Sequence, residues 1–328
     1  MNNRRKLIFA LGAGALAAPF GSFAQQKDKV WRIGFLGTVF ASGFGFADRV
    51  EALRAGLREA GYIEGKNLVF EFRWAEDKNE RLPELAAELV RLKVDVIVTH
   101  GSGTLAAKNA TTTIPIVMAL SGDPVATGVV ASLARPGGNV TGMTGINPEV
   151  VAKRLELLVD AFPRTRRVAV LLNPDTGSTI HSLRAMELAA KSLKLELYQF
   201  EVRRAVDIDG AFTTMAKRRV DAVASIDDGV LTANSGVIAN HAAKMLLPSV
   251  GLSEFAEAGG LMAYGPNRRE MFRRAAYFVD RILRGSKPGD LPVEQPTTFE
   301  LIVNMKTARA LGIKIPNSIL VRADKVIE

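Results

Sequence analysis

Apolar runs and amphipathic segments alternate along most of the chain. The first apolar run, Trp31–Leu36, has the length and composition of a buried strand. Val50, Leu53 and Leu57 follow it at spacings of three and four residues, which places them on one face of a helix. Near-continuous apolar strands that alternate with helices are typical of parallel sheets covered by helices on both faces. The pattern therefore predicts an α/β protein.

The same periodicities predict the elements that follow. Strands are expected over 68–73, 95–99, 114–120, 167–172, 195–202 and 221–226, with shorter ones near 249–251 and 261–264. Helices are expected over 82–90, 104–109, 125–133, 148–162, 180–193, 207–218, 232–245 and 271–283.

The alternation restarts after the turn Arg135–Asn139, so the 328 residues divide into two Rossmann-like lobes. Lobe 1 is expected over 30–142 plus about 265–290, and lobe 2 over 143–264 plus about 296–328. No Pro/Ser-rich linker separates them, so the connections are expected to be short hinge crossings. Ligands of such sheets bind at the carboxyl ends of the strands, which predicts a ligand cleft between the lobes.

Residues 1–24 have the three zones of a bacterial secretory signal peptide: a basic start, an apolar stretch and small residues before a cleavage point. The apolar stretch, Leu7–Ala18, is too short to span a bilayer as a helix. The pair Arg4-Arg5 resembles a twin-arginine signal. Both the twin-arginine and the general secretory route stay open, and a retained membrane anchor is the remaining alternative.

Composition excludes several kinds of site and partner. The chain has no Cys, which rules out disulfides, thiolate zinc sites, iron–sulfur clusters and Cys nucleophiles. It has 3 His, which argues against a multi-His metal site. The net charge of +9 is spread along the chain without an arginine-rich tract, so no nucleic-acid partner is expected. No metal and no cofactor are predicted.

Small polar residues follow the predicted strands of lobe 1. Thr38 comes after the first strand, and Asp123 comes after the fourth. Gly101, Ser102 and Thr104 lie between the third strand and its helix, where amides and hydroxyls suit a carboxylate or phosphate. We predict that all five contact a ligand. For the 101–104 turn and for Asp123, plain helix capping is the alternative.

Four residues occupy the equivalent places in lobe 2. They are Asn173, Asp227, Asp228 and Tyr264, and we predict that all four contact a ligand. A free carboxylate at a strand end suits a ligand ammonium group, so Asp227 is a candidate for that contact. Turn formation is the alternative role for Asp227.

No catalytic set is found. The chain lacks a nucleophile elbow, a Walker A loop and an HExxH motif. The residues His100, His181 and His241 lie in different segments, and Glu254 is expected on a helix surface. The sequence therefore favours a binding protein over an enzyme.

Several segments together resemble the ABC-transporter substrate-binding protein family that includes tryptophan-binding receptors. They are Ala52–Tyr62 with Glu64–Asn67, Arg81–Val90, Gly122–Val125, Ala134–Gly142, Glu257–Gly265 and Pro292–Thr297 with Phe299–Leu301. The match covers nearly all of Val30–Glu328 in a consistent order.

The resemblance implies a type I periplasmic-binding-protein-like fold, with two lobes that close on a small solute. It implies delivery of an amino acid or small carboxylate to an ABC permease in the inner membrane, by a monomeric, periplasmic protein. Gly101 and Ser102 match a Gly-Ser/Thr pair that resembles a carboxylate cradle. Asp227-Asp228 matches an Asp-Asn pair in which Asp227 would bind the ammonium, although Asp228 departs from Asn. A lipobox Cys is absent, so no lipoprotein is expected.

Two other roles fit the same fold. A sensor-type binding protein would dock on a membrane kinase or chemoreceptor in place of a permease. A periplasmic enzyme on this scaffold would turn over the bound solute.

Overall fold

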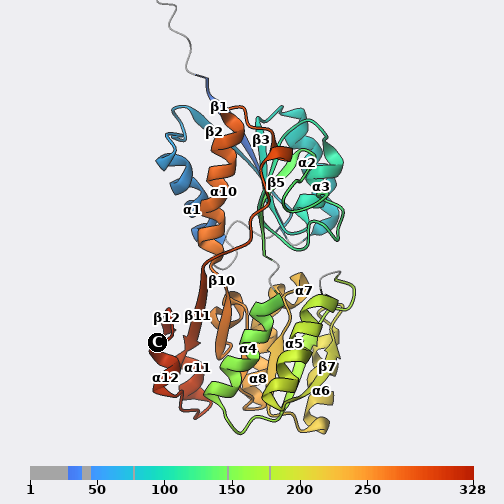
Figure 1. Ribbon diagram of the computed structural model, residues 1–328, viewed down its shortest axis with the longest axis vertical. Helices are drawn as coiled ribbons and strands as arrows, with labels where there is room; N and C mark the ends of the chain where they lie inside the picture. Colours follow the sequence, from blue (N-terminus) through green and yellow to red (C-terminus); the bar gives the residue numbers. More distant parts are fainter. Residues whose placement is uncertain (1–28, 39–45, 77, 146–147, 177–178) are drawn as a thin grey trace, which may run out of the picture. The chain divides into compact units, whose positions relative to one another are not determined.

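The computed structural model describes residues 29–38, 46–76, 78–145, 148–176 and 179–328 (Figure 1). The predicted signal peptide, 1–24, lies outside the described residues. Residues Trp31–Glu328 form one compact unit that contains two β-sheets. The helices and strands are numbered as in Figure 1.

The first sheet has 5 parallel strands in the order β2-β1-β3-β4-β5. They are β1 (Trp31–Gly37), β2 (Leu68–Trp74), β3 (Val96–His100), β4 (Ile116–Ser121) and β5 (Val140–Thr144). Side chains alternate between the faces, because Ile33 and Phe35 enter one core cluster and Leu36 another. Helices α1 (Phe46–Glu59) and α10 (Arg268–Leu283) cover the first face, and α2 (Leu82–Arg91) and α3 (Gly103–Ala110) the second.

The second sheet has 7 strands in the order β12-β11-β10-β9-β8-β6-β7. They are β6 (Arg167–Leu172), β7 (Glu196–Glu201), β8 (Ala222–Ser225), β9 (Ser249–Gly251), β10 (Met262–Pro266), β11 (Phe299–Asn304) and β12 (Lys325–Ile327). All neighbours are parallel except β10 and β11. The antiparallel pair departs from the all-parallel sheet that the sequence pattern predicts.

Helices cover both faces of the second sheet as well. One face carries α4 (Pro148–Ala161) and α5 (Thr179–Leu193), and the other carries α6 (Asp207–Arg218) and α8 (Ser235–Lys244). Shorter helices are α7 (Gly229–Ala233), α9 (Ser253–Glu257), α11 (Met305–Ala310) and α12 (Asn317–Leu320). Two 3-10 turns, Asn79–Arg81 and Pro288–Asp290, complete the described elements.

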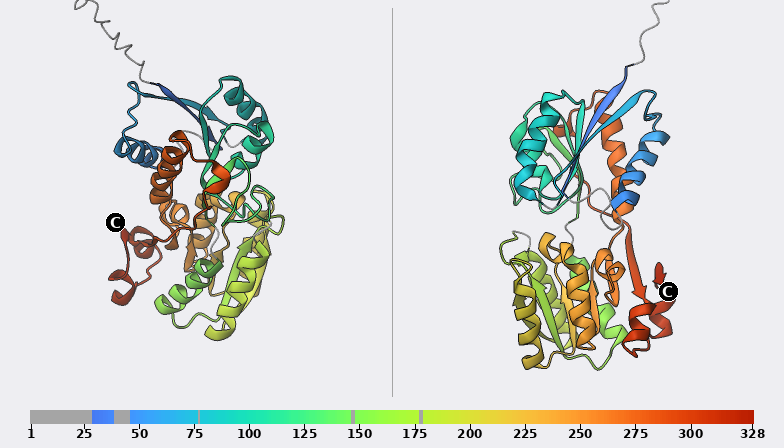
Figure 2. Two further views of the ribbon diagram at one scale, coloured as in Figure 1. Left: turned by 45° about the horizontal axis from the view of Figure 1, so that its top comes forward. Right: turned by 180° about the vertical axis from the view of Figure 1, so that it is seen from behind.

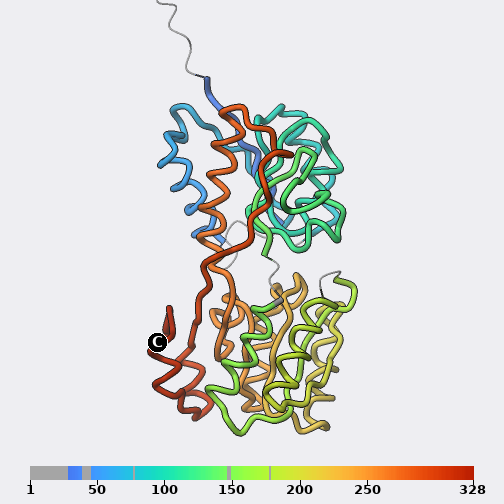
Figure 3. The backbone as a smooth tube through the Cα atoms, in the orientation of Figure 1, coloured from blue at the N-terminus to red at the C-terminus, as the bar shows by residue number. Residues whose placement is uncertain are grey.

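The chain passes from the second sheet to the first and back again near its end. Helix α10 follows β10 but packs beside α1 on the first sheet (Figures 1 and 2). The chain then returns to β11, as the backbone tube in Figure 3 shows. The amide of Asn267 donates to the carbonyl of Thr298 at 3.0 Å, so the outgoing and returning segments are hydrogen-bonded to each other. The residue limits of the two lobes stay a prediction.

Two predicted helices are wrong. Residues 125–133 form turns, because Asp123 accepts the amides of Val125 and Ala126 and Gly128 takes a left-handed φ of +67°. The helix expected over 232–245 is broken into α7 and α8 at Asn234. There the Asn234 side-chain amide bonds to the carbonyl of Val230 at 2.8 Å, which competes with the helical ladder.

Strand β5 is not predicted by the sequence pattern. Within this strand, position 142 has room only for glycine. Its φ is +128°, and a Cβ there would lie 2.2 Å from the carbonyl oxygen of Met118 on β4. Only glycine allows the two strands to approach in this way.

We expect Gly142→Ala to destabilise the protein by about 2–4 kcal/mol, because it adds both backbone strain and a clash inside a buried sheet. Urea unfolding followed by circular dichroism measures this change. Gly138→Ala is the matched control, since a Cβ at Gly138 meets nothing within 4 Å. Equal stability of the two variants would contradict the prediction.

Candidate functional site

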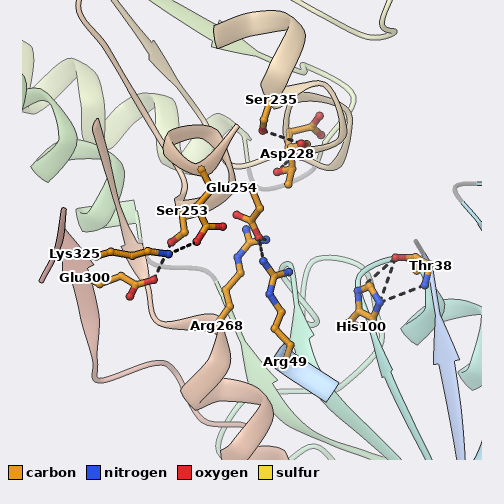
Figure 4. Close-up of polar contacts among 12 residues, drawn as sticks. Thr38, Arg49, His100, Asp228, Ser235, Ser253, Glu254, Arg268, Glu300 and Lys325 are labelled. Atoms are coloured by element: carbon orange, nitrogen blue, oxygen red, sulfur yellow. Dashed lines mark hydrogen bonds and ion pairs between the residues drawn. The ribbon is translucent and has the colours of Figure 1, made fainter. Parts of the chain in front are cut away.

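Thr38 and His100 meet where β1 and β3 end (Figure 4). The Thr38 amide donates to Nε2 of His100 at 3.3 Å, and the Thr38 hydroxyl lies 3.4 Å from both ring nitrogens. The imidazole is buried against Phe46, with ring centroids 4.7 Å apart. The predicted site residue Thr38 therefore lies beside a histidine of the neighbouring strand.

His100 is held in its neutral form. Burial, together with the nearby charges of Arg49 and Arg268, lowers its pKa to about 3. The ring nitrogen Nε2 accepts a backbone amide, which agrees with an unprotonated nitrogen at that position.

The turn that starts α3 carries Gly101, Ser102 and Thr104. Gly101 has a φ of +54°, and its amide is bonded to the carbonyl of Leu120 at 2.9 Å. The Ser102 hydroxyl donates to Oδ1 of Asn79 at 3.0 Å and makes no capping bond. The Thr104 side chain is buried, and its hydroxyl has no hydrogen-bond partner among the described residues. The ligand contacts of these three residues stay predictions.

Asp123 follows β4 and organises its own turn. Its Oδ1 accepts the amides of Val125 at 3.0 Å and Ala126 at 2.9 Å. Capping is therefore present, although it holds a turn where a helix was expected. Contact with a ligand stays a prediction.

Asn173 and Asp228 come together where β6 and β8 end. Asp228 caps α7 through Oδ1, which accepts the amides of Val230 at 2.7 Å and Leu231 at 3.1 Å. Its Oδ2 accepts from the hydroxyl of Thr176 at 2.5 Å and from the side-chain Nδ2 of Asn173 at 3.3 Å. Asp228 therefore has an evident role in shaping this end of the sheet.

Asp227 and Tyr264 are linked through Arg154, which was not expected from the sequence. The Arg154 guanidinium donates from Nη1 to Oδ1 of Asp227 at 2.5 Å and from Nε to the carbonyl of Tyr264 at 2.7 Å. The Tyr264 ring stacks on Phe299 with centroids 6.1 Å apart. The guanidinium carried by α4 thus connects the residue that lies two positions after β8 with β10.

A second arginine–carboxylate group involves Glu254 of α9 (Figure 4). Its Oε1 accepts from Arg268 at 2.5 Å and also from Arg49. The Glu254 side chain is 11% exposed, so the expectation of a helix-surface charge is wrong. Burial alone would raise the pKa of Glu254, but the charges of Arg268 and Arg49 outweigh it, and the net pKa is lowered.

For one of these unexpected residues, the sequence does indicate an unusual environment. Arg154 lies on the apolar stripe formed by Val151, Leu155 and Leu158, so a charge there is either buried or a break in the pattern. Arg49 and Arg268 carry no such signal, because both sit among other charged residues near helix starts.

Within the described ranges, no three His, Asp or Glu side chains are grouped so that they could hold a metal ion. No helix in the described part of the chain has the length and apolar character that a membrane crossing requires.

Comparison with known families places these features in context. Residues 38–327 match the model of the family described as ABC transporter substrate binding protein. This chain belongs to that family. The finding confirms the resemblance drawn from the sequence segments, and it identifies the chain as a substrate-binding protein.

Known relatives of this substrate-binding protein come from several bacteria. A tyrosine-binding protein of Clostridioides difficile (strain R20291) is 25% identical over 260 residues, covering 79% of this chain and 74% of the relative. A solved ABC domain from Streptococcus pneumonia in complex with L-Trp is 25% identical, with a TM-score of 0.82 over 91% of this chain and 100% of that one. A conserved domain protein of Vibrio cholerae is 27% identical, with the same TM-score and coverage.

More distant structures confirm the fold class of this substrate-binding protein. The leucine-binding protein LivK of Thermotoga maritima superposes with a TM-score of 0.58 at 15% identity, covering 86% of this chain and 87% of that one. The predicted α/β fold of the type I periplasmic-binding-protein kind is therefore confirmed.

The buried, neutral His100 makes stability depend on pH. Its folded pKa of about 3 lies below the ordinary value of 6.5, so protonation favours the unfolded chain as pH falls below about 6.5. Between pH 7 and pH 5 we expect this residue alone to remove about 2 kcal/mol, at about 1.4 kcal/mol per pKa unit. Urea unfolding at both pH values should show a smaller loss in His100→Gln. An identical loss in wild type and variant would contradict the prediction.

Removal of the Glu254 charge should leave the buried guanidinium groups of Arg49 and Arg268 without their carboxylate partner and so lower the stability of the fold. We expect Glu254→Gln to destabilise the protein by about 3–5 kcal/mol at pH 7, since breaking a buried pair leaves uncompensated charge. Glu59→Gln is the control, because its pair with Arg273 is half exposed and solvent screening leaves it with little effect on stability. Chemical unfolding measures both, and a Glu254→Gln effect as small as the control would refute the prediction.

Proposed function

We propose that this chain is the periplasmic substrate-binding component of an ABC import system. It captures a small polar solute, either an amino acid or a small carboxylate, by closure of its two lobes and delivers the solute to a permease in the inner membrane. The protein acts as a monomer, and residues 1–24 are the signal peptide that directs its export.

The observation that carries the proposal is the gathering of polar groups at strand ends, on a chain whose family binds transport substrates. Thr38, Ser102 and Asp123 follow strands of one sheet, and Asn173 and Asp227 follow strands of the other. Groups contributed by both sheets can contact a solute together only in the closed state, so the solute stabilises closure by that difference in contacts.

An amino acid is the solute we favour. The named relatives support it, since one is a tyrosine-binding protein and another was solved with L-Trp. In this proposal the Gly101–Ser102 turn binds the carboxylate of the ligand and Asp227 accepts from its ammonium. Thr38, Asn173 and Tyr264 line the remainder of the site. Thr104 and Asp123 complete the proposed ligand contacts, while Asp228, which already accepts from four donors, shapes the strand end.

Calorimetry and thermal unfolding of the chain from Gln25 to Glu328 test this proposal, with L-tyrosine and L-tryptophan as probes and their D-enantiomers as controls. At 100 times the dissociation constant, a bound ligand should stabilise the fold by about 2.7 kcal/mol. Mass spectrometry of the released solute should find it chemically unchanged. If neither L-amino acid binds or raises the melting temperature, the proposed ligand class is wrong. If the solute is converted, the proposal of a transport receptor is wrong.

A further inference from the structure

Arg154 is a charged side chain without contact with solvent. Its exposed fraction is 0%, and it lies among the apolar residues of α4 that pack on the second sheet. A guanidinium in such a place requires both an opposite charge and acceptors for its N–H groups. Asp227 supplies the charge at 2.5 Å, and the carbonyls of Ser225 and Tyr264 accept at 3.0 and 2.7 Å.

The two carbonyls are available because β9 is short. The last pairs that β9 makes are Ala224 with Val250 on one side and Ala263 with Gly251 on the other. Ser225 and Tyr264 are the next residues along β8 and β10. The guanidinium therefore bonds to the two strands that flank β9, at the point where β9 ends. From this position it also reaches Asp227, which follows β8.

The neighbouring carboxylate of Asp228 is already saturated. A carboxylate offers about four acceptor positions. Both oxygens of Asp228 are used twice, by the amides of Val230 and Leu231 and by Thr176 and Asn173. Among the described residues, Asp227 accepts only from Arg154, through Oδ1, and its side chain is 33% exposed. Asp227 is thus the carboxylate of this strand end with capacity for another donor.

We propose that Arg154 is a positioning residue for ligand recognition. By holding Oδ1 from inside the sheet, it fixes the Asp227 carboxylate with its other oxygen presented to the ammonium group of an amino-acid ligand. A carboxylate restrained before binding loses less side-chain freedom when the ligand arrives. This inference rests on the proposed amino-acid function, and it adds a residue that has no contact with the ligand.

A purely structural role for Arg154 makes a different prediction. In that case its loss would lower stability without changing which ligands are preferred. The informative quantity is therefore a ratio, the affinity for L-tyrosine over that for 3-(4-hydroxyphenyl)propionate, which is the same molecule without the ammonium group. The ratio of L-tryptophan to indole-3-propionate gives a second, independent value.

Both ratios are measured by calorimetry on the wild type, Arg154→Met and Arg154→Lys. We expect each ratio to fall about tenfold in Arg154→Met, although Asp227 is still present. Lys keeps a charge beside Asp227 but cannot reach all three acceptors, so Arg154→Lys should recover part of the ratio. Arg154→Lys also serves as the test if Arg154→Met does not fold. Arg167→Met is the control, because Arg167 pairs with Asp221 at 3.1 Å where β6 and β8 begin, at the opposite end of β8 from Asp227.

Each outcome of this experiment either supports or contradicts the positioning role of Arg154. Lower ratios in the Arg154 variants and an unchanged ratio in Arg167→Met support the positioning role. Unchanged ratios in the Arg154 variants overturn it and leave the proposed function in place. Raised ratios also overturn it, since Arg154 would then act only as a charge that opposes the ammonium. Failure of the wild type to bind either L-amino acid overturns the proposed ligand class and this inference with it.

Discussion

A guanidinium group shielded from water must find its charge partner and its hydrogen-bond acceptors within the protein. Arg154 meets this requirement through Nε and Nη1, which bond to Asp227 and to carbonyls of β8 and β10, while its Nη2 has no partner among the described residues. The helix that carries it, α4, packs on the same sheet through Val151 and Leu155. The packing of α4, the spacing of the strand ends and the orientation of Asp227 therefore depend on one another.

A second buried carboxylate is also paired with arginine side chains. Glu254 is held between Arg49 and Arg268, and these two cations in turn help to keep His100 neutral. A protein without Cys has no thiolate or disulfide for this purpose, and arginine forms several directed bonds from one planar group. The charges near the strand ends are thus coupled, and a change in one alters the proton affinity of its neighbours.

The sequence predicts the strands of the two sheets well where they are continuous apolar runs, as in β1, β3 and β6. It does not predict β5, because Thr141 and Gly142 break the apolar run and the strand depends on contact with β4. At the candidate site, the rule that parallel strands end at one edge places Thr38 and Asp227 correctly at strand ends. The buried state of Glu254 could not be predicted, since its two partners come from sequence positions far away. The ligand contacts of the site residues remain predictions.

Neither hydrophobic core is made from one continuous stretch of chain, and this affects the order in which the protein can fold. The core of the first sheet includes Phe272 and Phe278 of α10, which are synthesised after most of the second sheet. The core of the second sheet includes Val303 and Ile319, close to the end of the chain. A nascent chain that stops before α10 therefore has two incomplete cores. Both must wait for late residues, so folding during synthesis cannot proceed one finished half at a time.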